Sequence, residues 1–191
     1  MATMSYPSPN KLENQEFMTN PGVMTIPRVI SISSRNVLEI HPAVEMEKLR
    51  HDHRILKDLQ VPEGSSIRIP SFSGDCIELN LEVEASRNSQ FVLKVCCSKL
   101  NHEETAIIFD SKKNILKIDT SRSSLDKNVF RPDVMARYQG KQSDVPVQEA
   151  PFRLESDESL KLRVFLDRSI LEVFSNNRQA IAQRIYPINR D

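Results

Sequence analysis

Residues Leu160–Pro187, with the sequence LKLRVFLDRSILEVFSNNRQAIAQRIYP, decide the fold class of this 191-residue chain. Three runs of alternating or continuous apolar residues follow one another in this stretch, at 160–166, 170–174 and 180–186. Short polar turns rich in Asp, Ser, Asn and Arg separate the runs. Period-two alternation broken by such turns is typical of antiparallel strands with one buried face. The stretch therefore predicts a three-stranded meander that packs against a second sheet.

The middle of the chain repeats this texture. Residues 77–84 alternate strictly between apolar and polar side chains, which predicts a strand with one dry face. Residues 106–109 and 115–119 flank a polar turn and predict a hairpin. Residues 91–97 are apolar on both faces, which favours a strand in the centre of a sheet.

Regions nearer the N-terminus carry weaker patterns. Short strand pieces are expected at 23–32, broken at Pro27, and at 36–40. Residues 42–50 predict one short helix, with a proline near its start, acidic residues early and basic residues late. Residues 121–150 contain two prolines and mixed charge, and predict a long surface loop.

These elements together predict an all-β protein with one short helix near residues 42–50. The expected architecture is a two-sheet antiparallel β-sandwich of the jelly-roll or concanavalin-like kind. Residues 1–19 are rich in Ser, Pro, Asn and Gln without periodicity, and are expected to form a flexible tail or linker. Residues 20–191 are expected to form a single β-sandwich domain, a size that all-β domains reach undivided.

The charge balance limits the expected partners. Lys plus Arg and Asp plus Glu both number 26, so the formal net charge is zero and no basic excess exists to attract nucleic acid or anionic lipid. No apolar run approaches the roughly 20 residues that cross a bilayer, and the polar N-terminus lacks the pattern of a signal peptide. We therefore expect no nucleic-acid or membrane partner. A cytoplasmic location is expected if the chain is complete, and export remains open if it is a fragment.

Glu172 is the acidic residue whose position asks for an explanation. It lies between Ile170 and Phe174 on one strand face, where apolar neighbours would partly desolvate it. A structural cross-strand ion pair is the favoured interpretation, with Arg163 or Arg184 on an adjacent strand as the partner.

Other residues that could carry chemistry are better explained as structural. The acidic doublets Glu103-Glu104 and Asp157-Glu158 lie beside turns and are expected to be solvated. Residues 51–53, His-Asp-His, lack further ligands nearby, so a polar connector is expected and no metal site. The neighbouring Cys96 and Cys97 are expected to be inert free thiols within a strand.

Carbohydrate binding by a sandwich of this kind requires exposed aromatic side chains beside polar groups. The chain has no Trp and aromatic residues make up only 6% of it. Tyr138 in the predicted long loop is the candidate carbohydrate-contacting residue.

Several motifs resemble glycoside hydrolase family 32, which includes invertases, levanases and inulinases. Residues 162–174 with 183–187 resemble the C-terminal signature of that family. Residues 22–28, GVMTIPR, are similar to its "G-V-L-T-L-P-R" strand, and 42–50 to its "P-V-x-E-L-E-x-L-R" helix. Residues 119–124, DTSRSS, resemble its "D-R-S-x-S-S/G" turn. The matches follow the family's order and span most of the chain.

The resemblance implies which part of such an enzyme this is. Family members join an N-terminal five-bladed β-propeller, which holds the catalytic carboxylates, to a C-terminal β-sandwich. The propeller motifs "N-D-P-N-G", "R-D-P" and "E-C" do not occur here, and Arg131-Pro132-Asp133 has the wrong order. The resemblance therefore implies a sandwich module with no catalytic residue and no cofactor.

Two functions follow as hypotheses. The first is an accessory module of a hydrolase that acts on β-fructofuranosyl bonds in sucrose, levan or inulin. Its expected partners are a catalytic propeller, on the same or a separate chain, and a second copy in a homodimer. The alternative is a freestanding carbohydrate-binding or protein-interaction module.

Overall fold

The computed structural model describes residues 23–86, 88–129, 131 and 144–189. Within this part of the chain, ten strands and one short 3₁₀ helix follow one another. Their bounds are β1 (Arg28–Ile32), β2 (Leu38–Pro42), η1 (Val44–Leu49), β3 (Cys76–Val83), β4 (Gln90–Val95), β5 (Thr105–Asp110), β6 (Ile115–Asp119), β7 (Val147–Pro151), β8 (Leu160–Asp167), β9 (Ile170–Ser175) and β10 (Gln179–Arg184).

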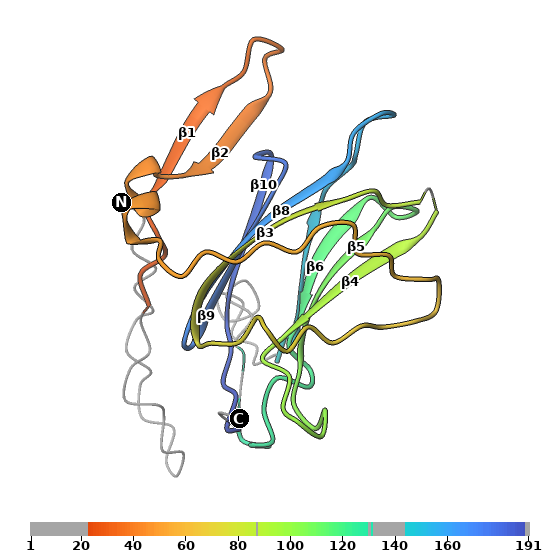
Figure 1. The fold of residues 1–191 in the computed structure, drawn as a ribbon. Coiled ribbons are helices and arrows are strands. Elements are labelled where there is room, and N and C mark those ends of the chain that lie inside the picture. Colours follow the sequence, from red (N-terminus) through yellow and green to blue (C-terminus); the bar gives the residue numbers. More distant parts are fainter. Residues whose placement is uncertain (1–22, 87, 130, 132–143, 190–191) are drawn as a thin grey trace.

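Eight of the strands form two four-stranded antiparallel sheets that face each other (Figure 1). One sheet has the order β10-β9-β8-β3 and the other the order β4-β5-β6-β7. The chain crosses from the first sheet to the second after β3 and returns after β7. This arrangement confirms the predicted all-β, two-sheet sandwich, and η1 lies within the predicted helical segment.

The C-terminal meander has the predicted strands and turns. In β8 and β9 the inward-facing residues pair directly, with Val164 opposite Val173 and Leu166 opposite Leu171. The tight turn after β8 places Arg168 at a positive φ of 50°. In the turn after β9, Asn176 and Asn177 have positive φ angles of 44° and 55°, a conformation that Asn tolerates better than most residues.

The core lies between the two sheets and draws on both. β3 adds to the meander because its apolar residues pair with those of β8, for example Leu81 with Leu162. The fully buried side chains interdigitate as expected of a close-packed interior. The buried cluster consists of Val95, Ile107, Phe109, Leu116, Ile118, Phe152, Leu160, Leu162, Val164, Leu166, Leu171, Val173, Ile181 and Ile185.

Two predictions about the second sheet were wrong. β4 is an edge strand and Val92 on its outer face is 43% exposed, although 91–97 suggested a central strand. The strand ends at Val95, and Cys96 follows in a turn with a positive φ of 51°. At the other edge, β7 pairs with β6 inside the segment predicted to be a loop. Its sequence, VQEAP, has too few apolar residues to show a strand period.

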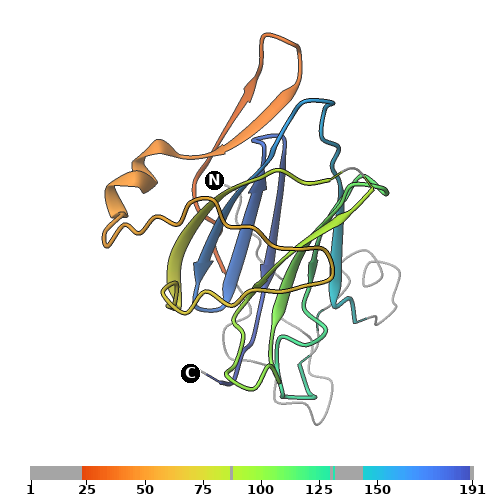
Figure 2. The same cartoon turned by 45° about the vertical axis from the view of Figure 1, so that its right-hand side comes forward.

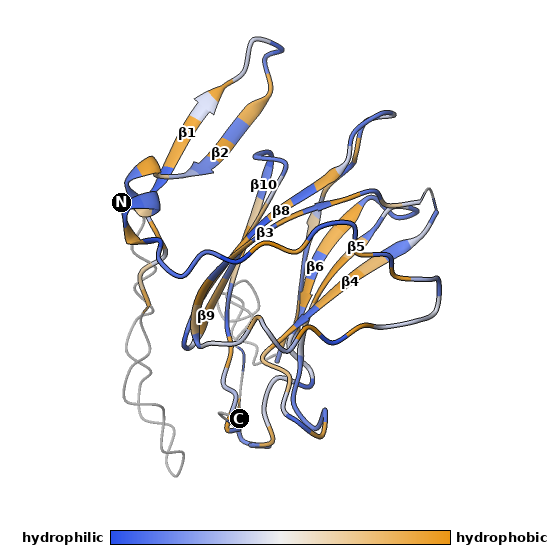
Figure 3. Cartoon of the chain, viewed as in Figure 1, coloured by the Kyte–Doolittle hydropathy of each residue, from blue (hydrophilic) through white to orange (hydrophobic). Residues whose placement is uncertain are grey.

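β1 and β2 form a separate two-stranded antiparallel sheet, which we call the N-terminal hairpin (residues 28–42). Figures 1 and 2 both show it projecting beyond the ends of the two large sheets. Its strand β2 contacts β9 and β10. Hydrophobic residues recur along both of its strands, between hydrophilic ones (Figure 3). The hairpin belongs to neither sheet of the sandwich, so its apolar residues need a separate explanation.

Candidate interface

On the outer face of the β10-β9-β8-β3 sheet, two residues of β9 are buried although they point away from the core. Alternation along β9 directs Glu172 and Phe174 away from the core, yet each side chain is only 1% exposed. Opposite Glu172 lie Phe165 on β8 and the small Ala182 on β10. The N-terminal segment that leads into β1 covers this face.

The Glu172 carboxylate accepts hydrogen bonds from Ile26 in that segment and from Arg28, the first residue of β1. Arg28 Nη2 lies 2.5 Å from Glu172 Oε2, and the backbone N–H of Ile26 donates to Oε1 over 2.8 Å. The Arg28 guanidinium lies 5.2 Å from the centre of the Phe174 ring. A buried carboxylate thus accepts a charge-assisted bond while an aromatic face supports the cation.

The predicted partners of Glu172 were therefore wrong. Arg163 instead donates from Nε to Glu78 on β3 over 2.6 Å and stacks 5.1 Å from the Phe165 ring. Arg184 lies over the ring of Tyr186, at 5.0 Å. Both arginines do lie on neighbouring strands, but Arg28 comes from 144 residues upstream, and a strand pattern does not report such a neighbour.

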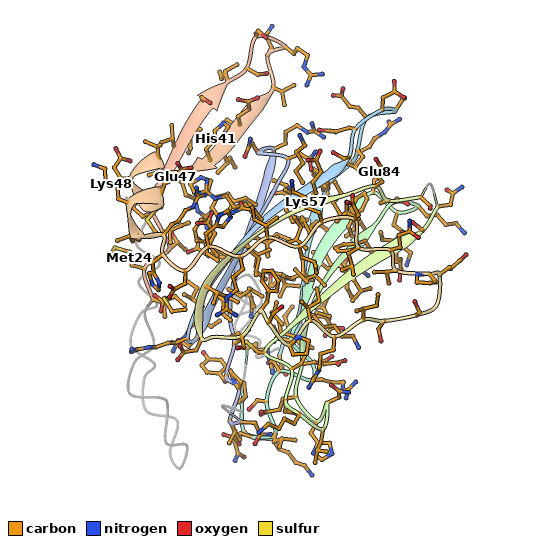
Figure 4. The ribbon with its side chains drawn as sticks, viewed as in Figure 1. Met24, His41, Glu47, Lys48, Lys57 and Glu84 are labelled. Carbon is orange, nitrogen blue, oxygen red and sulfur yellow. The ribbon has the colours of Figure 1, made fainter. Side chains whose placement is uncertain are left out.

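Glu78 holds a second ion-pair centre on the same face. Burial, the largest influence, acts to raise its pKa, but hydrogen bonds from Arg50, Arg163 and Asn80 together lower the pKa to about 2. Arg50 binds both carboxylate oxygens, at 2.8 and 2.7 Å. Because Arg50 directly follows η1, this pair ties the connector between hairpin and sandwich to β3. Glu47 of η1, labelled in Figure 4, also pairs with Arg50, at 3.4 Å.

The N-terminal hairpin exposes an apolar face. Its register places Ile30 opposite Ile40 and Ile32 opposite Leu38, so these four side chains share one face. Ile30, Ile32 and Leu38 are 69%, 72% and 52% exposed. We call these four residues the hairpin face. No other described strand pairs with β1, and an isolated two-stranded hairpin is only marginally stable in water.

The predicted solvated acidic doublets are partly buried instead. Glu103 is fully buried and accepts hydrogen bonds from the backbone N–H groups of Leu125, Ile188 and Asn189. Burial acts to raise its pKa, but these three bonds together hold the pKa below its ordinary value. Glu104 pairs with Lys94 and Arg122. Backbone donors from distant segments satisfy Glu103, and no local sequence signal announces them.

The second doublet divides between its two members. Asp157 is exposed as expected, whereas Glu158 is partly buried and forms a two-point ion pair with Arg178, at 2.7 and 2.6 Å. Hydrogen bonds from Arg178 are the main cause that lowers the Glu158 pKa to about 2. This pair joins the β7–β8 loop to the turn between β9 and β10.

The remaining candidates give no site. The exposed residues 51–53 form a connector, as predicted. Within the part of the chain that the structure describes, no three His, Cys, Asp or Glu side chains could together hold a metal ion. Cys96 and Cys97 are free, and burial raises the pKa of Cys96 to about 11, which keeps that thiol protonated and unreactive. Tyr138 lies outside the described residues.

Among the described residues, no helix has the length and apolar character needed to cross a membrane.

Fold and interface together define a class of protein: a two-sheet β-sandwich module with an apolar hairpin at its N-terminal side. Comparison with known proteins is specific about the family. The profile "Glycosyl hydrolases family 32 C terminal" matches residues 45–191. The chain therefore belongs to glycoside hydrolase family 32, as its C-terminal module.

Similar sequences come from bacterial enzymes of this kind. The chain is 32% identical over 149 residues to a levanase of Bacillus subtilis, covering 76% of this chain and 20% of the levanase. It is 25% identical over 171 residues to a sucrose-6-phosphate hydrolase of Zymomonas mobilis, covering 87% of this chain and 29% of that protein. The chain thus spans a fifth to under a third of the length of these relatives.

Solved structures support the fold. An exo-inulinase from Aspergillus awamori superposes with a TM-score of 0.71 at 22% identity, over 92% of this chain and 33% of the inulinase. The fructan 1-exohydrolase IIa from Cichorium intybus gives a TM-score of 0.72 at 21% identity, over 87% and 36%. In both cases the likeness covers only about a third of the longer chain.

Proposed function

We propose that this chain is an accessory module that packs against a catalytic β-propeller through the hairpin face. The complete enzyme would hydrolyse β-fructofuranosyl bonds, since the relatives are named levanase and sucrose-6-phosphate hydrolase. The sandwich would support the propeller, whose carboxylates would carry out the reaction. No residue of this chain is assigned a catalytic role.

One observation carries this proposal: the hairpin face is apolar, exposed and not covered by the sandwich. The family profile begins at residue 45, after the last hairpin residue, Pro42. Exposed apolar patches mark interaction sites more often than isolated exposed residues do. The exposed Ile30 and Ile32 side chains would therefore meet a neighbour that the sandwich does not supply.

The type of surface favours a β-rich partner. β2 already uses the Ile40 N–H to reach the β9–β10 turn, at Asn177 O, over 2.7 Å. β1 is not paired on its other side with any described strand. A free strand edge beside an apolar face is suited to extension of a sheet by another strand. Propeller blades are four-stranded sheets, so they would offer such a strand.

Co-expression tests the proposal. The partner is a family 32 catalytic propeller from which the counterpart of residues 23–189 has been removed. We expect a 1:1 complex by size-exclusion chromatography with light scattering, and fructose release from sucrose or levan only in the presence of the propeller. Ile32→Glu should abolish the complex because it places a charge on the hairpin face. Val92→Glu is the matched control on an exposed β4 position of the sandwich and should leave the complex intact.

Three outcomes would contradict the proposal. The first is the absence of any complex with the propeller. The second is equal loss of the complex in both variants, which would place the contact elsewhere. The third is sucrose or levan hydrolysis by the purified chain alone, which would mean that it contains an active site.

A further inference from the structure

The junction between the N-terminal hairpin and the sandwich is small. Among the described residues, the hydrogen bonds that join residues 23–42 to the sandwich are the two on Glu172, the bond from Ile40 N–H to Asn177 O, and a surface ion pair between Arg35 and Glu155 at 2.9 Å. Glu172 is thus a partner in half of these contacts. It is also the most deeply buried of the side chains that make them.

Both oxygens of the Glu172 carboxylate accept hydrogen bonds from residues at the start of β1. Oε1 accepts from the backbone of Ile26, and Oε2 accepts from the side chain of Arg28, with Pro27 between them. Proline fixes its own φ angle, so these two bonds leave little freedom in the direction in which β1 starts. Because Glu172 is 1% exposed, water does not replace either bond easily.

Glu172 itself sits on a rigid support. β9 lies between β8 and β10 in the sheet, and its inward neighbours Leu171 and Val173 are fully buried in the core. On the outer face, Ala180 and Ala182 of β10 lie opposite Phe174 and Glu172. These small side chains leave room for the N-terminal segment to approach the sheet closely.

We propose that Glu172 is a positioning residue: through Arg28 and Ile26 it fixes the direction in which the N-terminal hairpin leaves the sandwich. The hairpin face is thereby held at one angle to the core. The idea that this angle also orients a propeller rests on the proposed function. The attachment of the hairpin through Glu172 concerns this chain alone.

Amide hydrogen exchange in the isolated chain tests the fastening. Glu172→Gln keeps the shape of the side chain but removes its charge. The reporter is the Ile40 amide, which Glu172 does not touch and which is protected only while the hairpin is docked on Asn177. We expect it to exchange about tenfold faster or more in the variant, because a hydrogen bond to a buried charged group has been weakened. The Ile185 amide, bonded to Ser169 O at 2.9 Å, reports the sandwich and should keep its rate.

A matched variant shows whether faster exchange of the Ile40 amide is specific to Glu172 or follows from the loss of any carboxylate that contacts the hairpin. Glu155→Gln removes the other carboxylate that meets the hairpin, in an exposed pair, and should leave the Ile40 rate unchanged. Arg28→Gln removes the partner of Glu172 and should reproduce the Glu172→Gln pattern. It also serves as the second variant if Glu172→Gln does not fold.

Two results would overturn the inference. In one, the Ile40 amide keeps its wild-type rate in both Glu172→Gln and Arg28→Gln. In the other, Ile185 accelerates by the same factor as Ile40, so that Glu172 stabilises the whole sandwich and does not specifically fasten the hairpin. Neither result depends on propeller binding, which the co-expression experiment measures separately.

Discussion

The C-terminal meander and the N-terminal hairpin are both antiparallel and both alternate apolar residues with period two. In the meander, the alternating positions of β8 and β9 are buried against the facing sheet, and Leu171 is fully enclosed. In the hairpin, the equivalent positions Ile30 and Ile32 project into solvent. The two regions thus have the same kind of local pattern and opposite surroundings.

The difference shows that an apolar strand face needs a surface to cover it. The sequence of the strand does not say whether the same chain or another molecule supplies that surface. A sheet packed on a second sheet gains burial within its own chain. A two-stranded ribbon beyond the ends of the sandwich gains none on its outer positions. The exposed hairpin face is the surface for which we propose a propeller contact.

Substitution of one leucine in each region should produce the largest difference. Leu171→Ala is expected to lower the free energy of unfolding by about 2–5 kcal/mol, because it opens a cavity in the core. Leu38→Ala, on a half-exposed hairpin position, is expected to lower it by less than about 1 kcal/mol. Urea denaturation followed by circular dichroism measures both. Similar losses in the two variants would show that the hairpin contributes to the same core.

Acid should weaken the fold in part through the partly buried Glu158 carboxylate, which pairs with Arg178 of the meander. The Glu158 pKa lies at about 2 in the folded protein against an ordinary 4.5, so its ion pair stabilises the fold above about pH 4.5. That contribution is lost as the pH falls from about 4.5 towards 2, because the carboxylate must then take up a proton. Glu158→Gln should remove about 1–3 kcal/mol at pH 7 and flatten the decline of stability in acid.

The neighbouring Glu155 provides the control on the hairpin side. Its partner is Arg35 in the hairpin turn, and both side chains are well exposed. Glu155→Gln should leave unfolding at pH 7 and the acid decline unchanged, since exposed pairs contribute little. Thermal unfolding from pH 7 to pH 2 compares the two variants, and equal acid sensitivity would refute the distinction between them.

The sequence predicted the elements that local period controls. The meander, the 105–119 hairpin and the short helix are where the alternation and turn residues indicated. The position of a strand within its sheet was not predictable, because apolar residues on both faces of 91–97 did not reveal that β4 is an edge. β7 was missed since two apolar residues within VQEAP leave no period to detect.

The candidate interface was predictable only in part. The position of Glu172 between apolar neighbours correctly indicated a buried, paired carboxylate. Its partner Arg28 could not be found, because strand pairing reports only adjacent strands and Arg28 arrives from a segment outside both sheets. Glu103 was misjudged for a related reason: its backbone donors come from residues 125, 188 and 189, far away in the chain.

The smallest expected change in stability concerns the hairpin face itself. The double substitution Ile30→Ser with Ile32→Ser should change the free energy of unfolding by no more than about 0.5 kcal/mol, because both side chains are already largely exposed. Its effect should appear instead in solution behaviour. Binding of a hydrophobic fluorescent dye and self-association at high protein concentration should both fall, since an exposed apolar patch promotes each.

Val92→Ser is the matched control for this prediction, because it removes one exposed apolar side chain from a strand of the sandwich. It should alter dye binding much less than the hairpin variant does. A loss of more than about 1 kcal/mol in the hairpin variant would mean that Ile30 and Ile32 are packed within the chain. Dye binding could instead fall while self-association stays unchanged. The hairpin face would then bind small apolar molecules but would not pair with a second copy. That result would leave the proposed propeller contact as the role of this face.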